Sequence, residues 1–128
     1  MTYLLNYARS RSASTSAARV DELLVLNRPD FDGGAHVRVF VEDTSERKLR
    51  RRRLPSPRLK LRIADCVHEI HLEFSVDSYE ARENSLHKIE TLIAALERFR
   101  AGLAAEAELR ARRERHRQTT KGGARCRT

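Results

Sequence analysis

The sequence predicts an α+β fold in which a small antiparallel sheet packs on a long C-terminal helix. Apolar and polar residues alternate over residues 58–76, which is typical of a β-hairpin, and a second alternating run covers residues 36–42. From about residue 78 to residue 117, apolar residues recur every three or four positions, as they do along one face of a helix. With 128 residues, the chain has room for one small domain with tails.

The first 35 residues are predicted to be a weakly structured segment that contains one ambiguous element. Ser16 can cap a short helix over residues 17–26, in which Val20, Leu23 and Leu24 would share one face. The apolar run in the same stretch also fits a buried strand, so both alternatives stay open. Glycine, proline and aspartate follow, and they predict a turn.

Residues 36–42 are predicted to be a third strand, because three valines alternate along them and share one face. A loop is expected over residues 44–57. It contains the basic run 47–53 and two prolines, and neither feature suits the interior of a packed sheet.

The hairpin has a predicted register. If the chain turns around residue 65, Leu61 lies opposite Ile70 and Arg62 lies opposite Glu69, and every other pair also joins similar or complementary side chains. A one-residue slip would oppose apolar to charged residues. The turn lacks an Asn-Gly or Asp-Gly pair, so a two-residue loop and a four-residue loop both stay open.

The C-terminal helix is expected to begin at Asp77 or Ser78, either of which can cap it, and to continue to about residue 117. Gly102 is a candidate break. A folded unit over residues 36–108 would then lead into a basic, fraying helical arm and a disordered tail over residues 109–128. The helix carries a continuous apolar stripe that consists of Leu86, Ile89, Leu92, Ile93, Leu96, Phe99 and Leu103.

A short helix, three strands and a final helix would be similar in order to the double-stranded RNA-binding domain. That family opens its last helix with a basic cluster that binds phosphates, whereas this helix would open with Tyr79-Glu80-Ala81-Arg82-Glu83. The resemblance covers the order of the elements alone and implies no function for this chain.

The net charge of +8 is unevenly distributed. Residues 1–53 carry 11 basic and 7 acidic side chains, residues 54–108 carry 7 and 10, and residues 109–128 carry 8 and 1. Positive charge is therefore concentrated in the loop and the C-terminal arm, where it could bind phosphates. The 22 arginines stand beside only 4 lysines and 15 alanines, a bias that a GC-rich genome also produces.

Two cysteines, Cys66 and Cys126, do not form a disulfide framework, and no apolar run approaches the length of a membrane span. We therefore expect a cytoplasmic protein in a reducing environment, without membrane contact. Residues 1–20 contain no acidic side chain, which is also the composition of an organellar transit peptide.

No motif predicts an enzyme, a cofactor site or a small-molecule substrate. Cys66 and His68 would share a strand face, but no second pair of ligands stands at zinc spacing. Glu83, His87 and Glu90 would line one flank of the helix, which is typical of ordinary charged helix surface. We therefore predict no catalytic residue and no metal site.

The sequence favours a small non-enzymatic binding or scaffolding protein with a homodimer or another protein as its partner. Self-association would use six residues of the stripe, as in a coiled coil: Leu86, Ile89, Ile93, Leu96, Phe99 and Leu103. The alternative is a nucleic-acid-associated accessory protein. Its phosphate contacts would be Arg47, Lys48, Arg50, Arg51, Arg52, Arg53, Arg110, Arg112, Arg113, Arg115 and Arg117.

Overall fold

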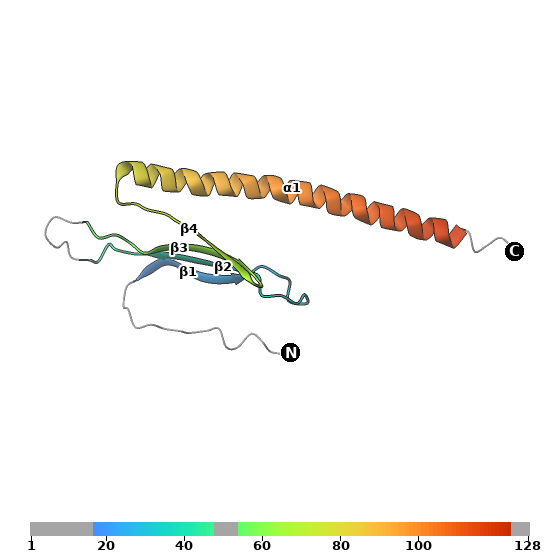
Figure 1. The fold of residues 1–128 in the computed structure, drawn as a ribbon, viewed down its shortest axis with the longest axis horizontal. Coiled ribbons are helices and arrows are strands. Elements are labelled where there is room, and N and C mark those ends of the chain that lie inside the picture. Colours follow the sequence, from blue (N-terminus) through green and yellow to red (C-terminus); the bar gives the residue numbers. More distant parts are fainter. Residues whose placement is uncertain (1–16, 48–53, 124–128) are drawn as a thin grey trace. The chain divides into compact units, whose positions relative to one another are not determined.

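The computed structural model describes residues 17–47 and 54–123 of the chain. They form four strands and one helix, and the fold is α+β, as predicted. The strands make one open antiparallel sheet in the order β1-β2-β3-β4, and the helix α1 follows as a single continuous element (Figure 1). The chain divides after Arg82 into two compact units, which are described separately below.

Strand β1 spans Ala18–Val25, where the sequence left a helix over residues 17–26 and a strand both open. The strand forms because β2 offers it a complete antiparallel partner, whereas an isolated helix of ten residues is marginal in water. It lies at the sheet edge and is mostly exposed, so it is not the buried strand considered above. Four strands therefore precede the helix, and the order of elements differs from that of the double-stranded RNA-binding domain.

Strand β2 spans His36–Glu42, which are the predicted bounds. It is a central strand between β1 and β3 and pairs with both in antiparallel fashion. The connection from β1 continues the hairpin, since the Leu26 N–H donates to the Ala35 carbonyl at 2.8 Å.

Strands β3, Leu59–Asp65, and β4, His68–Leu72, form the predicted hairpin, but in a register that differs by two residues. Leu61 lies opposite Leu72 instead of Ile70, and Arg62 lies opposite His71 instead of Glu69. A shift of two residues leaves every side chain on its own face, so the alternation that predicted the hairpin cannot distinguish the two registers. The loop decides between them, because Cys66 alone among the described non-glycine residues has a positive φ, 49°, and begins a two-residue turn.

The two faces of the sheet differ in chemistry. On one face, the register aligns apolar side chains across all four strands, for example Leu24, Val37, Ile63 and Ile70. The other face carries most of the charged side chains, and on it Arg38 forms an ion pair with Asp21 at 2.5 Å and Arg62 forms one with Glu69 at 3.4 Å. The second pair was predicted, and it forms diagonally in the observed register.

Little of the described chain is fully buried. The only apolar side chains in this class are Ala35 and Ala64, while the valines of β2 are half-buried. The sheet therefore presents an apolar face rather than enclosing a core of its own.

Helix α1 spans Tyr79–Gly123, a length of 45 residues. Ser78 caps it as predicted: its hydroxyl accepts from the Ala81 N–H at 3.0 Å, and its carbonyl accepts from the Arg82 N–H at 3.0 Å. The helix does not break at Gly102 and runs six residues beyond the predicted end at residue 117. Alanine, glutamate and arginine dominate residues 103–117 and favour helix there, whereas residues 118–123 include two threonines and two glycines, which favour it less. The predicted disordered tail lies outside the described residues from 124 onward.

Candidate functional site

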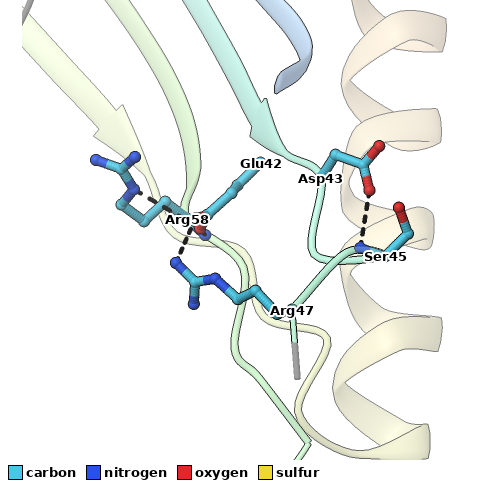
Figure 2. Close-up of polar contacts among 5 residues, drawn as sticks. All are labelled: Glu42, Asp43, Ser45, Arg47 and Arg58. Carbon is cyan, nitrogen blue, oxygen red and sulfur yellow. Dashed lines mark hydrogen bonds and ion pairs between the residues drawn. The ribbon is translucent and has the colours of Figure 1, made fainter. Parts of the chain in front are cut away.

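The base of the basic loop is organised around one buried carboxylate (Figure 2). Glu42 is the last residue of β2, and its side chain is fully buried. Its Oε1 accepts from the Arg47 guanidinium at 2.6 Å, and its Oε2 accepts from the backbone N–H of Arg58 at 2.7 Å. The Arg58 Nε lies 3.6 Å from the same Oε2. One carboxylate thus connects both ends of the β2–β3 loop.

Arg58 is held from two further directions. Its carbonyl accepts from the Glu42 N–H at 2.9 Å, which extends the ladder between β2 and β3 by one step. Its guanidinium carbon lies 5.3 Å from the centre of the Phe40 ring, within the range of a cation–π interaction. These contacts hold Arg58 at the end of the loop, next to the start of β3.

Next to this cluster, Asp43 fixes the first turn of the loop. Hydrogen bonds from the Ser45 hydroxyl and backbone N–H hold the pKa of Asp43 below its ordinary value of 3.8, and the Arg19 guanidinium at 3.2 Å adds to this effect. Because the pKa is lowered on folding, the resulting stabilisation is present above pH 3.8 and is lost as the pH falls through the folded pKa.

The chemistry of this cluster is that of an anchor. Both Glu42 oxygens already accept hydrogen bonds, one from the Arg47 guanidinium and one from the Arg58 backbone N–H. The strand pattern had placed Glu42 on the polar face, and nothing in that pattern marks it as buried. One pattern in the sequence could have indicated that Glu42 is buried: a glutamate at the end of a strand, with an arginine near each end of the loop that follows.

Of the predicted phosphate contacts in the loop, only Arg47 lies among the described residues. Arg47 is engaged with Glu42 through one nitrogen, although about half of its side chain is exposed. Lys48 and the run from Arg50 to Arg53 lie outside the described residues.

The predicted phosphate contacts of the arm all lie on helix α1. Arg110 forms an ion pair with Glu114 at 3.0 Å, and Arg115 forms one with Glu108 at 3.4 Å. The other three predicted contacts are Arg112, Arg113 and Arg117, and none of them forms an ion pair in the described part of the chain. Together with Leu109 and His116 they line a shallow surface recess.

The apolar stripe lies on α1, as predicted. Five of the six proposed contact residues are between 50 and 68% exposed: Leu86, Ile93, Leu96, Phe99 and Leu103. The sixth, Ile89, is half-buried. Large apolar side chains gathered along one line of a helix are unusual on a monomeric protein surface, where such residues are mostly scattered.

The stripe has the spacing of a coiled coil. Leu86, Ile89, Ile93 and Leu96 occupy successive positions of a 3-4 repeat, Arg100 takes the next position, and Leu103 the one after that. Leu92 and Phe99, which are seven residues apart, widen the seam on one flank. The heptad pattern therefore covers the middle of α1 with one charged interruption.

The residues considered as metal ligands are dispersed. Cys66 and His68 are exposed at the hairpin turn, and His87 lies 3.5 Å from the Thr91 hydroxyl. Within residues 17–47 and 54–123, no three histidine, cysteine or acidic side chains come together as a candidate metal site. No helix in these two segments is both long and apolar enough to cross a bilayer.

No protein-family model matches this chain, and neither does any curated protein or solved structure at a significant level. Its function must therefore be argued from its own residues.

Proposed function

We propose that this protein is a non-enzymatic binding or scaffolding protein that self-associates through the apolar stripe of α1. The observation that carries the proposal is the exposure of at least half of the side chain at Leu86, Ile93, Leu96, Phe99 and Leu103. Burying one such side chain contributes about 1.5–3 kcal/mol. A second copy of the chain offers the same stripe as its complement.

The length of the helix supports this proposal. At about 1.5 Å per residue, 45 residues span roughly 68 Å. Helices in proteins take most of their stability from packing of their apolar face. A partner helix along the stripe supplies that packing over several turns.

Sedimentation of the full-length chain at micromolar concentration tests the proposal, with Leu96→Asp as the disruptive variant. A charge in the centre of the seam should weaken association at least about 100-fold, because each dimer would bury two carboxylates. Thr91→Asp is the matched control. It introduces the same residue on the opposite side of α1 and should leave association unchanged.

Circular dichroism must accompany these measurements, because Leu96→Asp could act by unfolding the chain. The proposal expects Leu96→Asp to be folded and monomeric at concentrations where the wild type is dimeric. A wild type that sediments as a monomer at all micromolar concentrations contradicts it.

A second candidate function is phosphate binding by the helical arm. It is favoured by Arg112, Arg113 and Arg117, which line one recess and have no ion pair among the described residues. Several such contacts would give binding to generic duplex that weakens steeply with salt. The arm carries no aromatic residue, so base stacking is not part of this proposal.

Replacing Arg112, Arg113 and Arg117 together by glutamine tests the arm, with a short DNA duplex as the probe. The slope of log affinity against log salt should fall by about one for each arginine removed. The control replaces Arg110 and Arg115, which already have carboxylate partners, by glutamine. It should reduce the slope by less for each arginine removed. Unchanged affinity in the triple variant would reject the arm as the contact.

A further inference from the structure

We infer that two copies of this chain pair through α1 in antiparallel orientation, with Ile93 of one copy opposite Leu96 of the other. This inference rests on the proposed self-association and specifies its geometry. Three features of the helix support it: the layers of the seam, its flanks, and the distribution of charge along α1.

The seam of α1 matches itself when one copy is reversed. With Ile93 opposite the partner's Leu96, Leu86 falls opposite the partner's Leu103. The same register extends the overlap to Tyr79, which lies opposite the partner's Arg110. The heptad has two apolar positions along the seam, and each residue at one of them then faces a residue at the other position on the partner. The pair has the twofold symmetry of a homodimer.

Arg100 distinguishes the two orientations. In a parallel, in-register pair, the two Arg100 side chains would meet in one layer of the seam, where like charges repel. In the antiparallel register, Arg100 instead lies opposite Ile89 of the partner. Glu90, the next residue, then flanks the partner's Arg100 on the same side of the seam, so that each charge has an opposite charge within reach.

The flanks of the seam favour the same orientation. Leu92 and Phe99 widen the seam on one side, and Glu90 and Glu97 line the other. A parallel pair places the apolar flank of one helix beside the acidic flank of its partner, so that Leu92 faces Glu97. An antiparallel pair brings like flanks together, so that Leu92 packs near the partner's Phe99 and both remain out of water, while Glu90 and the partner's Glu97 share the other flank with Arg100.

Charge along α1 is polarised. Residues 79–97 carry four acidic and two basic side chains, whereas residues 98–123 carry eight basic and three acidic ones. In the antiparallel register the overlap covers residues 79–110, so the basic ends over residues 111–123, with five basic side chains and one acidic, lie beyond the partner helix. Parallel pairing would set the two basic halves side by side.

Dipolar spectroscopy on spin-labelled full-length protein tests the orientation. A single label is placed at Asn84→Cys in a Cys66→Ser, Cys126→Ser background, on the side of α1 away from the stripe. In the antiparallel register, position 84 lies level with residue 105 of the partner, so the two labels should be separated by about 32 Å along the axis. In a parallel pair they would be level, about 20 Å apart across the two helices.

A label at Ala95→Cys is the matched control, because position 95 lies within one residue of its own counterpart in either orientation. The inference expects a long distance at position 84 and a short one at position 95. Short distances at both positions would overturn the antiparallel geometry and leave self-association standing. An absence of coupling at both would reject self-association itself.

A charge reversal gives a second test. Glu97→Arg places an opposite charge beside Glu90 of the partner in the antiparallel pair and should strengthen association by about threefold to thirtyfold. In a parallel pair, position 97 faces Leu92 and gains no such partner. Glu83→Arg is the control on the same flank, where the partner offers Ala104, and it should leave association unchanged. Equal affinities of the Glu97→Arg variant and the wild type contradict the proposed register.

Discussion

At the scale of single residues, Glu42 is the best-defined feature of the sheet unit. It is buried at the end of a strand, and its two oxygens receive hydrogen bonds from both ends of one loop. A buried carboxylate is tolerated only where such partners replace its hydration. Its role is therefore to close the loop that carries the basic run.

We expect Glu42→Ala to lower the free energy of unfolding by about 1–3 kcal/mol, because it removes two hydrogen bonds to a charged acceptor. Arg47 and Arg58 are about half exposed and can regain water, which limits the loss. Glu46→Ala removes an exposed acid from the same loop and should change stability by no more than about 0.5 kcal/mol. Urea unfolding compares the two, and equal losses would contradict the anchoring role of Glu42.

Cys66 is the second informative residue, because its φ of 49° lies in the left-handed region. That conformation costs an L-residue roughly 1–2 kcal/mol, whereas glycine adopts it freely. Cys66→Gly should therefore stabilise the protein by up to about 1 kcal/mol after the entropic cost of glycine. Val67→Gly, at the neighbouring position without a positive φ, should destabilise it by about 0.5–1 kcal/mol. Melting temperatures that change in the same direction for both variants would argue against a turn in which Cys66 alone has a positive φ.

At the scale of elements, periodicity predicted what each segment forms better than where it pairs. The valines of β2 and the long stripe of α1 each repeat often enough to determine the element type. The β3–β4 register differed by two residues because such a shift exchanges one apolar pair for another. The end of α1 was placed six residues too early, because residues 118–123 contain no large apolar side chain and include two threonines and two glycines, which favour helix only weakly.

The continuity of α1 through Gly102 gives a prediction at this scale. A Cβ at this position would meet no atom within 4 Å, and the position lies away from the stripe. Gly102→Ala should therefore stabilise the helix by about 1 kcal/mol, and Ala101→Gly should destabilise it by a similar amount. Thermal unfolding followed by far-ultraviolet circular dichroism measures both. A loss of stability in Gly102→Ala would mean that glycine serves a purpose other than helix formation there.

At the scale of the whole molecule, each of the two units carries apolar surface that it does not bury by itself. The sheet has an apolar face of half-buried and exposed side chains, and α1 has its stripe. The proposed dimer would bury the stripe, and folding would then be coupled to association.

That coupling predicts a melting temperature that depends on protein concentration. For a dimer that unfolds to two chains, each tenfold rise in concentration adds about 1.4 kcal/mol to the free energy of unfolding, and the midpoint should rise by about 2–4 °C. The midpoint of the Leu96→Asp variant should be independent of concentration. A wild-type midpoint that does not move over a hundredfold range would argue for a monomer.

The sequence by itself determined the class of the fold, the bounds of β2, the hairpin, and the start of the long helix to within the two candidate caps Asp77 and Ser78. These features follow from local periodicity and local hydrogen bonding, which neighbouring residues specify. Only the tertiary structure decided that residues 18–25 form a strand, that the hairpin turns at Cys66, and that Glu42 is buried between Arg47 and Arg58. Each of these depends on which distant segment supplies the partner or on how a turn closes, and side-chain alternation does not encode either.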